Sequence, residues 1–328
     1  MKTSVRQREK YRKEKLSRER TDIAVKDAPV KVCLVFPNTY HAGMSNLAVH
    51  ALYALINSRS DTSCERSFFE EPLTAYSLES GSSIANFDII AFTISFELDY
   101  PKILGTLKKA GIPLRNADRG DNHPLIIGGG PCVFSNPEPI ADFFDLFVVG
   151  EGEELLHEIL DRYAEQLRQG RRKKEMLQAL SELSGVYVPS FYVPVYDAGG
   201  ALNKMDRIQG PELPVIGRIV SDLDCYPCSS VILTPDTEFS GMFLVELGRG
   251  CGRSCRFCAA GFAYRPPRVH DEEKLLARVR EAVQESGKVG LLSSSVLDTP
   301  GIENITGWIA GEGALFSVSS LRADLLTE

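Results

Sequence analysis

Three cysteines with short, regular spacing are the residues of this chain best suited to chemistry. Cys251, Cys255 and Cys258 are separated by three and then two residues, on a glycine-flanked stretch that follows an apolar run at 243–247. Thiolates are soft ligands that suit iron–sulfur clusters and zinc, and a closed site of either kind takes four protein ligands. Three thiols on one loop therefore predict an iron–sulfur cluster with one open iron, which a small molecule could chelate. A zinc site and three inert thiols are the alternatives.

The other five cysteines give weaker signals. Cys225 and Cys228 form a second C-x-x-C pair, for which an auxiliary cluster, a redox pair and a structural role are all open. The structural role is favoured because the pair lies in a proline-rich stretch and no βαβ pattern surrounds it. Cys33, Cys64 and Cys132 stand alone beside apolar runs, where a cysteine usually serves as a small buried hydrophobe.

Strands and helices alternate in the first half of the chain. Buried apolar runs and amphipathic stretches follow one another at 30–36, 46–56, 88–95, 100–110, 125–127, 146–149 and 153–168. This rhythm predicts an α/β domain with a doubly wound parallel sheet at 29–184. Ligands of such a sheet bind beyond the carboxyl ends of its strands.

A second βα rhythm begins at about residue 241. Expected strands and helices lie at 243–247, 272–286, 289–292, 302–310 and 315–318. They predict the first part of a (β/α) barrel over 241–328. Between 185 and 240, prolines interrupt short β-branched stretches, which predicts a linker with hairpins.

The net charge of -7 is unevenly distributed. Residues 1–20 carry nine Lys and Arg against three Glu, whereas the rest of the chain carries 28 against 41. Residues 1–28 are therefore expected to form a basic arm, disordered or helical. The arm is either a solvated segment or a binder of RNA or another polyanion. The acidic remainder argues against extensive nucleic-acid binding.

Hydropathy gives no sign of a membrane partner. No apolar run approaches the roughly 20 residues that cross a bilayer, and the N-terminal residues lack the apolar segment of a secretory signal. Nothing in the cysteine pattern argues for an oxidising compartment. We therefore expect a cytoplasmic protein.

The cysteine spacing carries a family resemblance. Cys251, Cys255 and Cys258, with Phe257 just before the third cysteine, resemble the CxxxCxxC motif of the radical SAM superfamily. The resemblance implies that the thiolates hold a 4Fe–4S cluster whose open iron binds S-adenosylmethionine (SAM). An electron from the cluster then cleaves SAM to a 5'-deoxyadenosyl radical, which abstracts hydrogen from a substrate.

The same resemblance suggests further residues and partners. Phe257 is a candidate cofactor contact. Asp298 and Arg322 follow the second and third strands of the expected barrel, where SAM contacts gather. A radical SAM enzyme also needs an electron donor such as a flavodoxin or ferredoxin. The residues that would act on the substrate, and the class of that substrate, stay unassigned.

The domain at 29–184 resembles the cobalamin-binding domain that precedes the barrel in one large radical SAM subgroup. That pattern runs D-x-H-x-x-G, then Ser or Thr after a middle strand, then Gly-Gly. Gly43, Ser95, Gly128 and Gly129 match it and are candidate cofactor contacts.

The match departs from the pattern at its cobalt ligand. Tyr40 stands at the position of the axial histidine and Asn38 at that of the aspartate. His41, one residue away, is a weak substitute because a one-residue shift redirects a side chain. Subgroup members that lack the histidine still hold cobalamin, so the resemblance leaves cobalamin binding open. Glu151, in the turn at 150–153, either contacts a cofactor or the barrel or favours the start of the following helix.

The expected barrel has only about three βα units, whereas a complete one takes on the order of 200 residues. An open parallel edge is an aggregation hazard unless it is covered. Two hypotheses follow. In the first, the chain is the N-terminal portion of a radical SAM enzyme whose barrel is completed by a second polypeptide or a longer frame. In the second, it is a non-catalytic module that holds cobalamin, an iron–sulfur cluster or zinc.

Overall fold

The computed structural model of the protein describes residues 4–226 and 228–325, which form two compact units. Unit 1 consists of the described residues within Met1–Ser17, Ala24–Gly43 and Leu52–Val220. Unit 2 consists of those within Arg18–Ile23, Met44–Ala51 and Ser221–Glu328. The stretch 185–240, expected as a linker, is divided between the two units at Val220.

Unit 1 is built on a six-stranded sheet in the order β2-β1-β3-β4-β5-β6. The strands are β1 (Val30–Phe36), β2 (Thr62–Phe68), β3 (Ile89–Thr93), β4 (Leu125–Gly129), β5 (Leu146–Val148) and β6 (Val186–Tyr187). The first five are parallel, and β6 pairs antiparallel with β5. Nearly every residue of β1 and β3 is buried, as expected for parallel strands covered on both faces. The predicted doubly wound α/β fold is confirmed.

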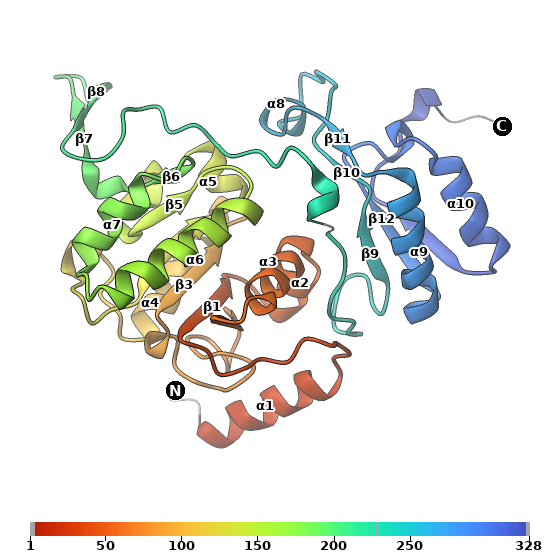
Figure 1. Ribbon diagram of the computed structural model, residues 1–328, viewed down its shortest axis with the longest axis horizontal. Coiled ribbons are helices and arrows are strands. Elements are labelled where there is room, and N and C mark those ends of the chain that lie inside the picture. Colours follow the sequence, from red (N-terminus) through yellow and green to blue (C-terminus); the bar gives the residue numbers. More distant parts are fainter. Residues whose placement is uncertain (1–3, 227, 326–328) are drawn as a thin grey trace. The chain divides into compact units, whose positions relative to one another are not determined.

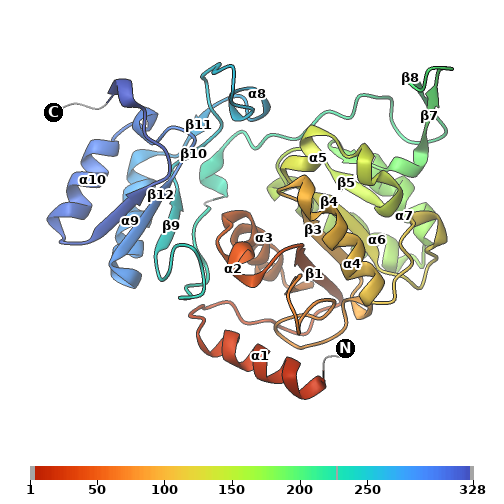
Figure 2. The same cartoon turned by 180° about the vertical axis from the view of Figure 1, so that it is seen from behind.

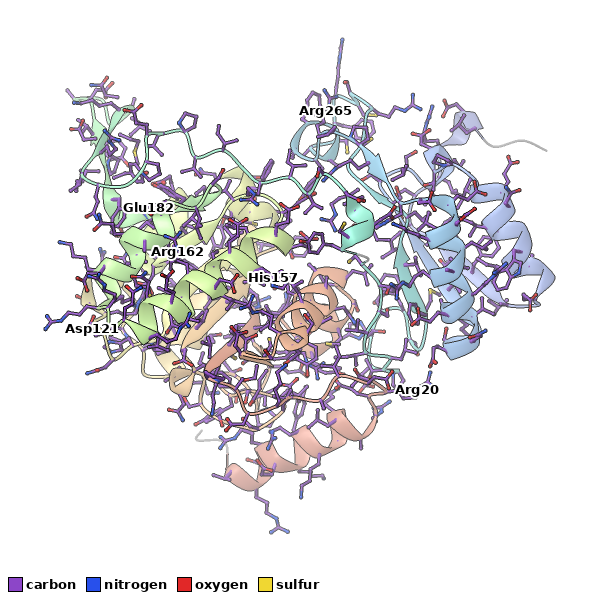
Figure 3. The ribbon with its side chains drawn as sticks, viewed as in Figure 1. Arg20, Asp121, His157, Arg162, Glu182 and Arg265 are labelled. Carbon is purple, nitrogen blue, oxygen red and sulfur yellow. The ribbon has the colours of Figure 1, made fainter. Side chains whose placement is uncertain are left out.

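Helices cover both faces of this sheet. Helix α6 (Glu153–Arg168) lies in front of it in Figure 1, and α4 (Tyr100–Lys109) lies in front of it in the opposite view of Figure 2. The other helices of this part of the chain are α2 (Tyr40–Met44), α3 (Leu47–Ser58), α5 (Pro131–Ser135) and α7 (Lys173–Ser181). Arg162 of α6 donates to Glu182, just after α7, at 3.3 Å (Figure 3).

The basic arm contains helix α1 (Val5–Ser17). Its Arg12 is buried and donates through Nε to the carbonyl oxygen of Leu78 at 2.7 Å. The Lys15 ammonium lies 4.7 Å from the centre of the Tyr40 ring. These two cations thus contact other parts of unit 1, and binding of a polyanion by the arm stays a prediction.

Unit 2 holds a parallel sheet in the order β13-β12-β9. Its strands are β9 (Phe243–Glu246), β12 (Lys288–Leu292) and β13 (Leu315–Val318), and its main helices are α9 (Glu272–Ser286) and α10 (Ile302–Gly311). Helix α9 packs on β9 and β12, and α10 packs on α9 and β13, so both cover one face of the sheet (Figure 1). Asp271 caps α9 by accepting from two backbone amides, and Gly287 ends it in the left-handed conformation. The strands and helices predicted at 243–318 are confirmed.

Short elements complete the two units. In unit 1, β7 (Tyr192–Tyr196) and β8 (Leu202–Arg207) form an antiparallel hairpin within the stretch where hairpins were expected. In unit 2, β10 (Gly248–Arg249) pairs antiparallel with β11 (Arg268–Val269), and the short helix α8 (Ala260–Ala263) lies between them in the chain. No helix of the described residues is long and apolar enough to cross a membrane.

Candidate metal centre

The three predicted ligands lie on one loop of unit 2. This cysteine loop, residues 250–267, leaves β10 and returns on β11, and the pairing of these two strands closes its base. The Cys251 amide donates to the carbonyl oxygen of Tyr264 at 3.2 Å, and the Cys258 amide donates to that of Cys255 at 3.0 Å. Cys255 is exposed, the other two are half-buried, and all three are free thiols.

Two glycines allow the loop to fold tightly. Gly250 has a φ of +87°, and an ideal Cβ there would lie 2.3 Å from the carbonyl oxygen of Tyr264. An ideal Cβ at Gly261, on α8, would lie 2.1 Å from the carbonyl oxygen of Arg253. Real Cβ atoms essentially never approach within 3.0 Å of another heavy atom, so both positions need glycine. The cysteines are therefore carried on a closely packed loop.

The donor set of this loop is sulfur alone. Between 248 and 269 the chain contains no Asp, Glu or His beside the three cysteines. Within 4–226 and 228–325, no group of three His, Cys, Asp or Glu side chains is gathered as a metal site, so the thiols share a loop without converging on one point. Three accessible soft donors without competing hard ligands nevertheless fit an iron–sulfur cluster in their chemistry.

Asp298 ties the cysteine loop to the strand ends. It lies in a short 3-10 turn after β12, and its carboxylate accepts from Arg253 Nη2 at 3.0 Å and from Arg322 Nη1 at 2.9 Å. Hydrogen bonds and charge from Arg253, with help from Arg322, lower the pKa of Asp298 despite partial burial. The structure thus brings the two predicted SAM contacts, Asp298 and Arg322, together with the cysteine loop. Their contact with SAM stays a prediction.

Phe257, the predicted aromatic contact, is 93% exposed. Phe262 is also exposed, and the Arg265 guanidinium lies 5.5 Å from the centre of its ring. Arg265, labelled in Figure 3, follows α8 at the outer end of the loop. The loop therefore presents aromatic rings and cations beside Cys258, where a ligand could stack on them.

A buried ionic group lies where the cysteine loop returns to the sheet. His270 follows β11 directly; its Nδ1 is 2.9 Å from Asp224 Oδ1 and its Nε2 is 3.8 Å from Glu246 Oε2. Glu246 also accepts from Arg249 at 3.1 and 2.9 Å. Burial disfavours the imidazolium, but hydrogen bonds and charge from Glu246 and Asp224 outweigh burial and raise the pKa of His270. His270 thus bridges the strand end at Glu246 and the turn at 223–225.

The same group lines a cavity of about 340 Å³ in unit 2. Its walls combine apolar residues with charges of both signs: Asp224, Cys228, Val245, Glu246, His270, Lys274, Leu275, Ala277, Arg278 and Glu281. Sequence reasoning missed this group and the Arg253–Asp298 pair. Arg253 and Asp298 are 45 residues apart and His270 and Asp224 are 46 apart, so no local spacing reveals these two pairs.

The remaining cysteines are mostly buried. Cys33, Cys64, Cys132 and Cys228 are buried, and burial raises the pKa of the first three, as expected for inert thiols. Cys225 is exposed, and a hydrogen bond to a neighbouring aspartate raises its pKa. The two members of the second C-x-x-C thus lie in unlike environments. A structural role for this pair stays a prediction.

In unit 1, polar groups at the carboxyl edge of the sheet pair with one another. Asn38 donates to Asp99 Oδ1 at 3.0 Å, and Lys102 donates to the same oxygen at 2.9 Å. Ser95, a predicted cofactor contact that follows β3, is half-buried. Asp99 Oδ2 and Thr93 Oγ1 are buried without a partner among the described residues. Most of the polar atoms named here thus form hydrogen bonds with one another, but two of them do not.

Two of the glycines that match the cobalamin pattern are packed against aromatic rings. An ideal Cβ at Gly43 would lie 2.5 Å from the Phe68 ring, and one at Gly128 would lie 2.7 Å from the Phe147 ring. Gly129 has only ordinary contact, at 3.7 Å, with a neighbouring valine. The space beside Gly43 and Gly128 is thus already occupied by the domain itself.

The axial position is closed as well. Tyr40 has no exposed surface, packs edge-on against Phe68 with ring centroids 5.2 Å apart, and lies beneath the Lys15 ammonium. His41 lies on the exposed side of α2. A buried phenol thus stands at the axial position, and the structure shows no cobalt ligand there. Cobalamin binding stays a prediction.

Glu151 binds a nearby segment of its own unit. The backbone of Arg218 bridges that of Gly150, and the Val220 amide donates to Glu151 Oε2 at 2.6 Å. The Arg218 guanidinium also binds Glu158 on α6 at 2.7 Å. The turn at 150–153 is therefore covered by residues 217–220.

Comparisons with known proteins show what the chain is similar to. A family model described as the N-terminal part of radical SAM proteins matches residues 48–189. The uncharacterized protein MJ0966 of Methanocaldococcus jannaschii is 32% identical over 306 residues, which cover 90% of this chain and 56% of that protein. The chain thus spans about half the length of this relative.

A solved structure also overlaps with the chain. The radical S-adenosylmethionine methyltransferase TsrM from Kitasatospora setae, determined with cobalamin and a [4Fe–4S] cluster bound, matches with a TM-score of 0.49 and 14% identity. The overlap covers 87% of this chain and 51% of that one. The family match thus makes residues 48–189 of this chain similar to the N-terminal region of radical SAM proteins.

Proposed function

We propose that this chain holds a 4Fe–4S cluster on Cys251, Cys255 and Cys258 and binds SAM at the iron that these three thiolates leave open. The observation that carries the proposal is a tightly folded loop with sulfur as its only ligand type, in a chain whose residues 48–189 match radical SAM proteins. When bound, such a cluster supplies the electron that cleaves SAM. The chain would then serve an enzyme that activates a C–H bond of its substrate.

At this site the protein's own residues hold the three cysteines in place at the ends of the strands. Gly250 and Gly261 let the backbone fold closely around the cysteines, and Asp298 ties the loop to the ends of β12 and β13. The carboxyl ends of parallel strands are where ligands of β/α sheets bind. Phe257 is exposed there and is proposed to contact the bound cofactor.

Further polypeptide and an electron donor are proposed as partners. Strand β13 lies at the edge of its sheet, and Leu315 and Phe316 on it are 63% and 42% exposed. Such an edge pairs readily with another strand. We propose that a second polypeptide, or more of a longer one, adds βα units here, and that a flavodoxin or ferredoxin reduces the cluster.

A reducing compartment suits this chemistry. All eight cysteines are free thiols in the structure. Thiols remain reduced in the cytoplasm, and thiolate ligands need that state. We therefore propose a cytoplasmic location.

One observation favours the alternative that the chain alone is a non-catalytic module. Within the described residues, the sheet of unit 2 has only three strands, fewer than a barrel needs to enclose a substrate. In this alternative the chain alone holds a cluster but does not use it. Cluster-dependent formation of 5'-deoxyadenosine by the purified chain would eliminate it.

Anaerobic reconstitution with iron and sulfide tests the cluster. The proposal expects about four iron atoms per chain in the unmodified protein and a loss of most of this iron in Cys255→Ala. Cys225→Ala is the matched control because Cys225 is also exposed but lies outside the cysteine loop. Equal iron in both variants, or none in the unmodified protein, contradicts the proposal.

A further inference from the structure

Arg253 is held on several sides within the cysteine loop. It stands between Cys251 and Cys255, and its amide donates to the Cys251 sulfur at 3.4 Å. Its carbonyl oxygen packs against Gly261 and accepts from Arg265 Nη2 at 3.4 Å. The backbone between the first two cysteines is therefore fixed by contacts within the loop.

The side chain of Arg253 reaches out of the loop to the sheet. Its Nε and Nη2 donate to the two carboxylate oxygens of Asp298 at 3.4 and 3.0 Å. Such a two-point pair fixes orientation as well as distance, because the guanidinium and the carboxylate are both planar. Asp298 also accepts from Arg322, after β13, at 2.9 Å. One carboxylate, whose side chain is 35% exposed, thus joins the cysteine loop to the ends of β12 and β13.

We propose that Arg253 and Asp298 form a clasp that holds the cysteine loop on the carboxyl edge of the β13-β12-β9 sheet. Asp298 is then a positioning residue, which acts on the cysteines through Arg253 and does not need to touch SAM. The clasp itself is a property of the protein without a cluster. Its effect on cluster retention rests on the function proposed above.

The charges and geometry of the Arg253–Asp298 pair predict how substitutions at these two positions affect the cysteine loop. Asp298→Asn removes the negative charge between two arginines, and Arg253→Gln removes the two-point pair while it keeps a polar side chain. Both side chains are partly exposed, at 50% and 35%, so neither change buries an unpaired charge. The sheet should stay folded while the loop opens more often.

Hydrogen–deuterium exchange of the apoprotein tests the clasp directly. We expect amides of residues 250–267 to exchange about threefold to tenfold faster in Asp298→Asn and in Arg253→Gln, with α9 unchanged as internal reference. In the Asp298→Asn background, Arg253→Gln should add little, because its partner is already gone. Asp324→Asn, which removes a carboxylate that contacts Arg322, and Arg256→Gln, in the same loop, are the controls.

The outcomes separate the clasp from the cluster. Unchanged exchange in both single variants, or full additivity in the double variant, overturns the clasp whether or not a cluster binds. In the reconstituted protein, the clasp predicts a loss of iron to a chelator about threefold to tenfold faster in both variants than in either control. A protein that holds no iron disproves the proposed function, and the exchange result still decides the clasp.

Discussion

At the scale of single residues, Gly261 is the most demanding position of the cysteine loop. A methyl group there would meet the backbone of Arg253, which cannot move aside as a flexible side chain can. We expect Gly261→Ala to cost about 2 kcal/mol or more in the stability of unit 2 and to lower the iron bound. Thermal unfolding and iron analysis measure both.

Gly307 provides the matched control for this substitution. It lies within α10, is exposed, and has no atom within 4 Å of an ideal Cβ. Gly307→Ala should therefore stabilise the protein by about 0.5–1 kcal/mol, because alanine favours helix. If Gly261→Ala is as well tolerated as Gly307→Ala, the tight packing of the loop is refuted.

His270 makes the stability of unit 2 depend on pH. Its pKa is raised in the folded state, so its stabilisation is complete below the unfolded value of about 6.5 and is lost as pH rises through the folded value. The pKa values of Asp224 and Glu246 are lowered, so both stay ionised in this range. We expect His270→Gln to cost about 1–3 kcal/mol near pH 6 and less near pH 9.

Thermal unfolding of the two proteins at each pH measures this difference. His157→Gln is the control. Burial and the nearby Arg59 lower the pKa of His157, so the contribution of this histidine to stability should change with pH in the opposite direction. A cost of His270→Gln that is equal at both pH values contradicts a raised pKa of His270 in the folded state.

Local spacing explains which site residues the sequence could predict. The cysteine motif and Phe257 lie within eight consecutive positions, so their chemistry can be recognised without a structure. Arg253 lies within the same stretch, but its partner Asp298 is 45 positions away. His270 and Asp224 are similarly separated. Whether two such distant residues meet depends on how the loop folds, and the sequence pattern does not predict that.

At the scale of elements, apolar runs predicted β1, β3, β4 and β5, but β2 escaped prediction. Its sequence, TSCERSF, has no apolar alternation, yet nearly all of it is buried. Arg66 within it is 1% exposed and binds Glu79 at 2.6 Å, and its guanidinium lies 4.8 Å from the Tyr53 ring. A buried charge paired in this way looks like a surface residue in the sequence.

Unit 1 offers cobalamin no cobalt ligand at the axial position, because the phenol there is buried. Gly43, in α2, and Gly128, in β4, pack against Phe68 and Phe147, contacts that the sequence did not show. If the full chain retains hydroxocobalamin in equilibrium dialysis, the absorption spectrum should therefore be that of the free corrinoid. A spectrum shifted by a protein ligand to cobalt would contradict the buried axial position.

At the scale of the whole molecule, two separate lines support the radical SAM account. The family match lies at 48–189, whereas the cysteine loop lies at 250–267, outside the matched residues. Neither depends on the other, since the first rests on the N-terminal region and the second on ligand chemistry. The βα rhythm of unit 2 then supplies the parallel strand ends that such a site needs.

The most direct test of the central claim is electron paramagnetic resonance of the anaerobically reconstituted, dithionite-reduced chain, with and without SAM. Cys255→Ala serves as the cluster-deficient variant and Cys225→Ala as its control. The account predicts a reduced 4Fe–4S signal that changes when SAM is added, because one iron has no protein ligand. A cluster signal that SAM leaves unchanged, or the same signal in Cys255→Ala, would contradict an open iron held by this loop.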